Sequence, residues 1–385
     1  MEYYAHSLPG RPPSDWQKLE DHLKNVASTA KGFASVFGLE DEARIAGLLH
    51  DLGKYSSRFQ RRLSDSSVTG INHWSSGAHV AKNLGCRWLP FTIEGHHTGM
   101  PAFHRDDPRR SLRNTLLGMA EPTTCPEITG FSELSDELMD RLRHDGIEMK
   151  SHVDRREAIN FADAFQTRMI FSTLVDADYL DTERFMDPNL TATRYALPLS
   201  ADVPISVLEP QYRCEGGGIP LPLKADVAIG VLLAYLVAKP KDGRVNELRR
   251  SLLDECLCAA EREGRLQTLT APTGSGKTLA ALAFALRKAQ LKGCQRIISI
   301  IPYTTIIEQT ARIYRDVFSD IFGSSYVLEH HSNVGSGDEE DNEVYDPHSR
   351  SRLAAENWDA PIVVTTTVQF FESLFSNRPS ACRKL

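Results

Sequence analysis

Ala271-Pro-Thr-Gly-Ser-Gly-Lys-Thr278 is the most informative stretch of the chain. It follows Gln267-Thr-Leu-Thr270, which predicts a strand, and it precedes a helical pattern at residues 280–292. A loop in this setting directs successive backbone N–H groups at a polyphosphate held at the N-terminus of the helix. The order strand, loop, helix therefore predicts a nucleotide-binding lobe of the α/β class.

Individual positions of the loop have distinct expected roles. Gly274 and Gly276 permit the tight path of the backbone, Lys277 reaches the β- and γ-phosphates, and Thr278 offers a hydroxyl to Mg²⁺. The general pattern has glycine at its first position, where this chain has Ala271. We predict that ATP and Mg²⁺ bind at Thr273, Gly274, Ser275, Gly276, Lys277 and Thr278.

Short apolar runs alternate with helical patterns after this loop. Residues 296–301, 325–328 and 361–365 predict strands, and residues 306–318 predict a helix. Strands separated by helices form parallel sheets with crossover connections. The C-terminal part is therefore expected to be a lobe built on a parallel sheet.

One part of a nucleotide-hydrolysing site is missing from the sequence. Such a site needs an acid after a later apolar strand, to hold Mg²⁺ and the attacking water. The run at residues 361–365 is followed by Thr366, Thr367 and Val368, and the acids at residues 338–341 follow no apolar strand. We therefore expect this chain alone to lack complete ATPase and helicase activity, while the loop can still bind ATP.

The first 195 residues have a different character, because their patterns are mainly helical. Apolar positions recur at helical spacing over residues 19–37, and residues 40–52 begin with acids and end at Gly53. Residues 159–180 form a long apolar pattern that predicts a buried helix. Ten of the 13 histidines lie at or before His152, so one chemistry is concentrated in this part.

These histidines and nearby aspartates are candidates for a metal site. Imidazole together with carboxylate suits divalent transition metals, whereas oxygen ligands alone favour Mg²⁺ or Ca²⁺. Each residue alone has an ordinary structural explanation, but the ordered set on several helices can converge around two cations about 3.5–4 Å apart, which would bridge a phosphodiester. Lys54 would then meet a phosphate oxygen, unless it is a solvated helix lysine. The set is His22, His50-Asp51, His73 or His79, His96-His97, and Asp176 or Asp178.

Composition excludes several classes of protein. The chain has 385 residues, 41% hydrophobic and 25% charged, which is an ordinary globular composition. The seven cysteines form no C-x-x-C pair, so neither a disulfide framework nor a cysteine zinc site is expected. The net charge of −7 does not indicate a nucleic-acid-binding protein, although net charge does not determine the charge of a single groove. No membrane-spanning run or secretory leader is visible, and a cytoplasmic protein is expected.

The combined motifs resemble the HD nuclease–helicase family of type I CRISPR systems. The order of a His-Asp pair, distal histidines and a late aspartate is similar to the HD phosphohydrolase signature, and a superfamily-2 helicase loop follows it. In the first part, the motifs that carry the resemblance are Tyr4-Ala-His-Ser7, Asp21-His-Leu23, Leu49-His-Asp-Leu-Gly-Lys54 and Leu174-Val-Asp-Ala-Asp178. In the second part, they are the phosphate-binding loop Ala271–Thr278, Pro302-Tyr-Thr-Thr-Ile-Ile-Glu-Gln309, Glu329-His-His-Ser-Asn333 and residues 362–377.

The resemblance implies an α + α/β fold in three parts: an all-helical HD domain at residues 1–195, a connection rich in proline and glycine at 196–245, and at 246–385 the N-terminal part of a RecA-like lobe, truncated before the DExH box. It implies His22, His50, Asp51, His73, His96, His97 and Asp178 as metal ligands, and His50, Asp51 and Lys54 as catalytic residues. His73 is preferred to His79 for its context, and Asp178 to Asp176 because an aromatic residue follows it. His6 occupies a family-like position whose role the sequence leaves open.

The implied activity is cleavage of DNA with two manganese-like ions, in CRISPR interference. The expected partners are single-stranded DNA and a guide-RNA surveillance complex, with no membrane. Arginine clusters at residues 58–62 around Phe59 and at residues 105–113 are compatible with a strand path, although solvated faces explain them equally well. Two other hypotheses remain: an HD phosphohydrolase of small nucleotides with a regulatory phosphate-binding loop, and a nucleic-acid-binding ATPase whose histidines are structural.

Overall fold

The computed structural model contains two compact units. The first consists of Met1–Thr191 together with Glu372–Leu385, and the second of Ala192–Phe371. The residues that the structure describes are 2–97, 99–101, 112, 131–147, 161–195, 223–240, 242–323, 326–331, 358–376 and 378–379.

The first unit is mostly helical, as predicted, with one two-stranded antiparallel sheet near its start. A 3₁₀ turn at Leu52–Tyr55 follows α2 and carries Lys54. The elements are β1 (Tyr4–His6), β2 (Gln17–Lys18), α1 (Leu19–Ala34), α2 (Glu40–Leu49), α3 (Ser57–Ser64), α4 (Ser75–Asn83), α5 (Leu89–Gly95), α7 (Phe131–His144), α8 (Phe161–Met186) and α9 (Pro188–Tyr195).

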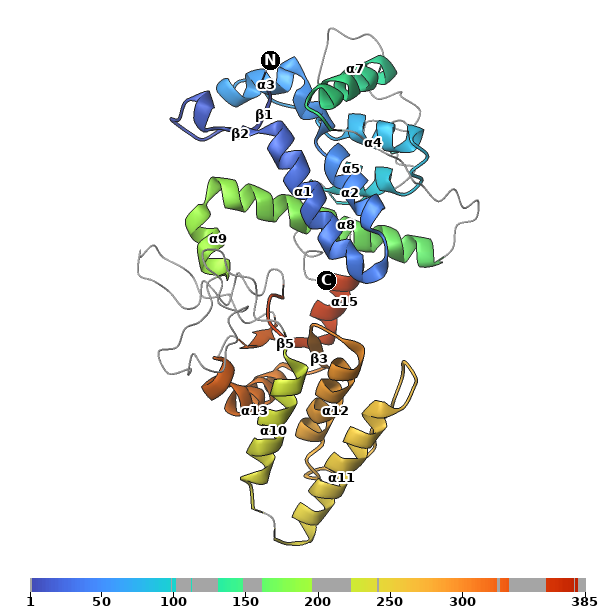
Figure 1. Cartoon of the computed structure of the whole chain (residues 1–385), viewed down its shortest axis with the longest axis vertical. Helices are drawn as coiled ribbons and strands as arrows, with labels where there is room; N and C mark the ends of the chain where they lie inside the picture. The colour runs from blue at the N-terminus through green and yellow to red at the C-terminus, as the bar shows by residue number, and fades with distance from the viewer. Residues whose placement is uncertain are drawn as a thin grey trace. The chain divides into compact units, whose positions relative to one another are not determined.

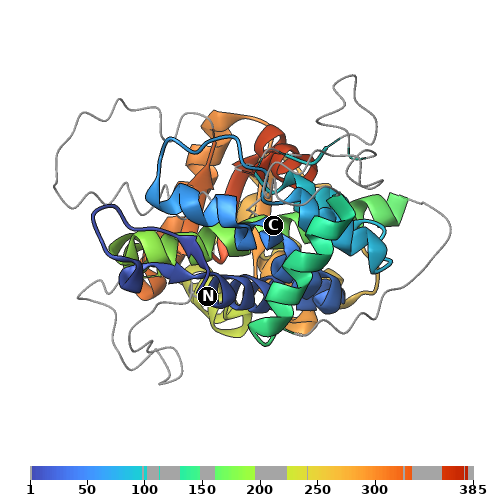
Figure 2. The same ribbon diagram turned by 90° about the horizontal axis from the view of Figure 1, so that it is seen from above.

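Helix α1 shows how the sequence builds the core of this unit. Leu19, Leu23, Val26 and Ala30 recur at helical spacing and are fully buried. α1 packs against α2 and α8, and the three helices can be followed in Figures 1 and 2. Because these helices share one core, the residues at the end of α2 and on the inner faces of α1 and α8 come together.

The second unit contains a three-stranded parallel sheet and its covering helices. The strand order is β3-β5-β4, and β5 pairs with both neighbours in parallel. Four of the five β5 residues are buried, which fits a central strand. The elements are α10 (Ala225–Val237), α11 (Arg244–Glu261), α12 (Lys277–Lys292), β3 (Ile297–Ile301), α13 (Thr304–Phe322), β4 (Val327–His330), β5 (Ile362–Thr366) and α15 (Thr367–Phe375).

The predicted parallel sheet is confirmed, but one of its predicted strands is wrong. Residues 267–270 form no strand, because no described segment runs beside them to supply a ladder of hydrogen bonds. Among the described residues, the segment directly before the phosphate-binding loop therefore belongs to no helix or strand.

Residues 196–245, which the sequence analysis predicted to be a connection, contain helix α10, which packs in the hydrophobic core of the second unit. Ala225, Ala228 and Leu232 of α10 are buried in the cluster formed by the sheet and its helices. No helix among the described residues is both long and apolar enough to cross a bilayer.

Candidate metal centre and nucleotide loop

All seven predicted metal ligands lie together in the first unit. The packing of five helices around one core produces this convergence. His22 is on α1, His50 and Asp51 follow α2, His73 precedes α4, His96 and His97 follow α5, and Asp178 is on α8.

The seven residues form two groups that share one carboxylate. Within each group, the potential ligand atoms all lie within 4.8 Å of one another. Both groups contain Asp51, so this residue can bridge two cations. The buried group is His22, His50, Asp51 and Asp178, and the open group is Asp51, His73, His96 and His97.

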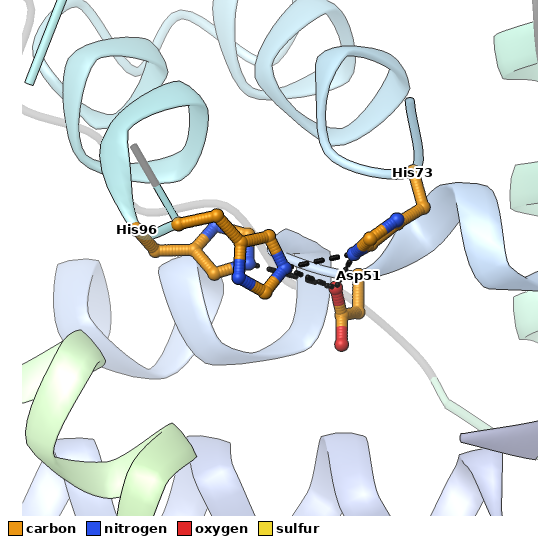
Figure 3. A group of neighbouring side chains, drawn as sticks. Asp51, His73 and His96 are labelled. Atoms are coloured by element: carbon orange, nitrogen blue, oxygen red, sulfur yellow. Dashed lines mark hydrogen bonds and ion pairs between the residues drawn. The ribbon is translucent and has the colours of Figure 1, made fainter. Parts of the chain in front are cut away.

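The open group surrounds one oxygen of the shared carboxylate. Asp51 Oδ1 lies 3.4 Å from His73 Nε2, 3.6 Å from His96 Nε2 and 3.9 Å from His97 Nε2. Figure 3 shows His73 and His96 approaching Asp51 from different segments of the chain. The side chain of His97 is 37% exposed, so this group is accessible from solvent.

The buried group surrounds the other oxygen. Asp51 Oδ2 lies 3.4 Å from His22 Nε2 and 3.2 Å from His50 Nε2. Asp178 Oδ1 lies 3.5 Å from the same nitrogen of His22 and 3.6 Å from that of His50. These four side chains are at most 10% exposed, so solvent reaches this group less easily.

Hydrogen bonds on the outer side of the rings orient two of the imidazoles. His50 Nδ1 donates to the carbonyl of Gly47 at 2.8 Å, and His96 Nδ1 donates to that of Ile93 at 2.7 Å. A carbonyl only accepts, so Nδ1 carries the proton, and in the neutral ring the lone pair is on Nε2. In both residues this nitrogen faces Asp51.

A carboxylate that the sequence analysis missed holds His22 in the same way. Asp181 Oδ2 accepts from His22 Nδ1 at 2.8 Å and from Gln17 Nε2 at 2.7 Å. Burial would raise the pKa of Asp181, but these hydrogen bonds keep it below its ordinary value, so the carboxylate stays ionised. The only sequence signal was its spacing of three residues from Asp178, which is too common on helices to single it out.

The donor set fits divalent transition metals. Asp51 Oδ1 and His96 Nε2 are buried and make no hydrogen bond to any residue that the structure describes. His22 Nε2 and His50 Nε2 lie 3.3 Å apart, and both Nδ1 atoms have acceptors, so loss of the proton shared between the two Nε2 atoms leaves two lone pairs directed at one place. A cation held by both nitrogens would take the place of that proton. Five imidazoles and two carboxylates suit manganese-like or softer ions better than Mg²⁺.

The pKa values of His50, in the buried group, and His97, in the open group, shift in opposite directions. Burial alone would lower the pKa of His50, but the carboxylates of Asp51 and Asp178 raise it to about 10. Both carboxylates have a lowered pKa in spite of burial, chiefly because Lys54 and His50 act on Asp51, and His50 and His22 on Asp178. In the open group, partial loss of hydration, followed by the influence of His96, lowers the pKa of His97 to about 3, although its side chain is 37% exposed. His73 shifts in the same direction for the same reason.

Lys54 lies inside this centre and is not a solvated lysine. Its side chain is 4% exposed, and Nζ lies 2.7 Å from Asp51 Oδ2. The ammonium also lies 3.5 Å from His6 Nε2 and above the ring of Phe59. Lys54 can therefore hold Asp51 in place and present positive charge to an approaching phosphate. His6, whose role the sequence left open, lies against Lys54.

The two alternative ligands lie outside both groups. His79 Nε2 pairs with Asn83 Nδ2 at 3.0 Å on α4, whereas His73 is within the open group. Asp176 belongs to neither group, whereas Asp178 belongs to the buried one. The assignment of ligands stays a prediction, but the geometry agrees with the preferred residue of each pair.

The predicted phosphate-binding loop has a backbone suited to that task. Gly274 and Gly276 have φ values of +83° and +85°, a conformation that other residues rarely adopt. α12 begins at Lys277, so the loop lies at a helix N-terminus. Lys277 Nζ donates to the carbonyl of Ala271 at 2.9 Å, and Arg249 Nε to that of Gly274 at 3.1 Å. Of the six predicted residues, Ser275 is buried, and Thr273, Gly274, Gly276, Lys277 and Thr278 are exposed.

The other predicted nucleic-acid contacts are only partly described. Arg61 and Arg62 are exposed on α3, and Arg58 is half-buried there. The arginines of the second cluster, Arg105, Arg109, Arg110 and Arg113, lie outside the described residues.

Comparison with known protein families supports both halves of this description. The model of the HD domain matches residues 19–123, and that of the DEAD/DEAH box helicase matches residues 252–385. The HD match includes six of the seven predicted ligands, and the helicase match includes the phosphate-binding loop. No curated protein matches the sequence.

Solved structures of Cas3 from T. fusca share the fold over almost the whole chain. The crystal structures of its AMPPNP, ADP and ATP complexes align with TM-scores of 0.56, 0.58 and 0.60, at 17%, 18% and 16% identity. Each alignment covers 99% of this chain and 45% of the Cas3 chain. The chain therefore spans less than half the length of these proteins. In fold and domain order it is Cas3-like: an HD domain followed by part of a helicase lobe.

Proposed function

We propose that this chain is a divalent-metal-dependent DNA nuclease with its reaction centre at Asp51. The observation that carries the proposal is the sharing of one carboxylate between two compact sets of ligands. Two divalent ions held by these sets would supply Lewis acidity and would lower the pKa of water, which is the chemistry that phosphodiester hydrolysis needs.

The chain's own residues divide the remaining work between them. His22, His50 and Asp178 form the buried side of the centre and exclude water from it. The phosphodiester enters on the side of His73 and His97, because these side chains are 15% and 37% exposed. Lys54 holds Asp51 and stabilises negative charge on the phosphate as it is attacked.

The neighbourhood of the open group suits a nucleic-acid backbone. Phe59 of α3 contacts His73, with a ring separation of 5.2 Å, so α3 lies beside this group. The same helix carries Arg58, Arg61 and Arg62. We therefore favour a DNA strand as substrate over a small nucleotide, which needs no such flanking charge.

The helicase part extends the proposal to the whole chain. We propose that Thr273–Thr278 bind ATP and Mg²⁺, because loop geometry, helix N-terminus and family match agree. The Cas3-like fold leads us to propose single-stranded DNA and a guide-RNA surveillance complex of a type I CRISPR system as partners. With these partners we expect the protein in the cytoplasm.

Cleavage by the purified chain tests the nuclease proposal. Labelled single-stranded DNA is incubated with Mn²⁺, with and without EDTA, beside the double variant His50→Ala/Asp51→Ala. We expect cutting by the wild type, and none with EDTA or with the double variant. His79→Gln is the matched control, because His79 is a buried histidine of the same unit outside both groups, and it should cut like the wild type.

Two further substrates separate the nuclease from a small-nucleotide phosphohydrolase. Bis-p-nitrophenyl phosphate reports diester hydrolysis, and nucleoside monophosphates report monoester hydrolysis. We expect turnover of DNA and the diester, with little release of phosphate from monophosphates. Equal cutting by wild type and double variant, or monophosphate turnover without DNA cutting, would overturn the proposal.

A further inference from the structure

The buried group of ligands is held from behind by a carboxylate that takes no part in it. Asp181 lies on α8 three residues after Asp178, so both carboxylates are on one face of this helix. Asp178 Oδ1 lies 3.5 Å from His22 Nε2, and Asp181 Oδ2 lies 2.8 Å from His22 Nδ1. The two carboxylates thus contact opposite nitrogens of a single imidazole.

Asp181 is itself fixed in position. Its side chain is 3% exposed, and the oxygen that accepts from His22 also accepts from Gln17 Nε2 at 2.7 Å. Gln17 is on β2, immediately before the helix that carries His22. Asp181 Oδ2 is therefore a preorganised acceptor: it is buried, it accepts from both Gln17 and His22, and its helix also carries the ligand Asp178.

We propose that Asp181 is a positioning residue for the metal centre: it fixes the tautomer and orientation of His22 and thereby strengthens the binding of one of two ions. This inference rests on the proposed metal-dependent activity and goes beyond its ligand set. An ionised acceptor at Nδ1 keeps the lone pair on Nε2, directed into the buried group, and makes that nitrogen a better donor to a metal. Backbone carbonyls do the same for His50 and His96 without a full charge.

The role predicts a graded effect on one ion only. Asp181→Ala removes both charge and acceptor, and the affinity for the Mn²⁺ or Co²⁺ ion of the buried group should fall about 10- to 100-fold. Asp181→Asn can still present an oxygen to His22 and Gln17, so it should fall between the wild type and the alanine variant. The second ion, bound by the open group, should keep its affinity, because no ligand of that group contacts Asp181. Arg184→Ala is the matched control, since Arg184 lies 3.9 Å from the other oxygen of Asp181 and does not contact His22.

Calorimetric titration of the metal-free full-length chain with Co²⁺, combined with its visible absorption spectrum, measures both affinities and the ligand field. In a His22→Ala background, Asp181→Ala should change the affinity no further, because Asp181 acts through His22. A structural role alone would lower the melting temperature without this coupling. If wild type binds two ions and Asp181→Ala binds them equally well, or if its effect persists without His22, the positioning role is wrong while the nuclease stands. If wild type binds no metal, the proposed function itself fails.

Discussion

Asp51 is the residue on which the candidate centre depends, because its two oxygens serve different groups of imidazoles. Oδ1 faces His73 and His96, whereas Oδ2 faces His22 and His50. A bridging carboxylate lets two cations lie close together, because its charge is shared between them. Loss of this one side chain should therefore affect both metal positions, whereas loss of a histidine should affect only one.

We predict that Asp51→Asn binds neither of two Mn²⁺ ions and that His97→Gln still binds one. The amide of asparagine has no charge to share, and His97 belongs only to the open group. The measurement is bound metal per chain by mass spectrometry, after loading and desalting. His79→Gln should retain both ions. Retention of one ion by Asp51→Asn would show that the carboxylate is not a bridge.

The acid–base state of the metal-free centre gives a pH dependence of metal binding. The pKa of His50, raised to about 10, means that this residue is protonated at neutral pH before metal binds. The ion must displace that proton, so its apparent affinity should rise up to about tenfold per unit between about pH 7 and pH 8.5. The pKa of His97 is about 3 and that of His73 is also lowered, so these two rings of the open group are already neutral and should add no such slope.

Calorimetry in two buffers of different ionisation enthalpy checks this prediction. The ion in the buried group should release one proton near pH 8, whereas His73 and His97 should contribute none to the binding of the second ion. In Asp178→Asn one carboxylate that holds the proton on His50 is lost, so its pKa falls and the release should shrink. Binding of the first ion without proton release in the wild type would contradict the electrostatic argument.

At the scale of elements, the position of His73 depends on a close approach of two segments. Gly53 donates its N–H to the carbonyl of His73 at 2.9 Å. A Cβ atom on Gly53 would lie 2.6 Å from the Cα of His73, which is a backbone atom and cannot rotate away. The turn after α2 and the segment before α4 can meet here only if residue 53 has no side chain.

We predict that Gly53→Ala displaces His73, weakens the ion of the open group and destabilises the protein by about 1–3 kcal/mol, the usual cost of overpacking. Gly32→Ala is the matched control. It lies within α1 with nothing within 4 Å of the added carbon, so it should be neutral or stabilise by up to about 1 kcal/mol. Urea denaturation and metal titration of both variants measure the difference. Equal behaviour of the two alanine variants would contradict the packing argument.

Local signals in the sequence predicted most elements that carry the sites, within a few residues. The strand expected at 361–365 is β5 at Ile362–Thr366, and its first four residues are buried. Residues 267–270 were also expected to be a strand but form none, because a strand also needs a neighbour, which local pattern cannot reveal. The same limit explains Asp181: its role depends on the register in which α8 packs against α1, which no local spacing encodes.

At the scale of the whole molecule, each proposed ligand belongs to one unit. The metal candidates lie around a core formed by helices of the first unit, whereas the nucleotide loop opens a helix that packs in the core of the second. A ligand stabilises the structure that binds it by RT ln(1 + [L]/Kd), which is about 2.7 kcal/mol at a hundredfold excess over Kd. Metal and nucleotide should therefore stabilise different parts of the chain.

We predict two thermal transitions in calorimetry: EDTA lowers one of them, and ATP with Mg²⁺ raises the other. Two variants test which transition belongs to which ligand. Asp51→Asn should remove the response to metal and keep that to nucleotide, because the bridging carboxylate is lost and the loop is intact. Lys277→Ala should weaken the response to nucleotide and keep that to metal, since the lysine is an exposed residue of the loop. If either variant changes both responses, binding of metal and binding of nucleotide are coupled, and the prediction of independent stabilisation is wrong.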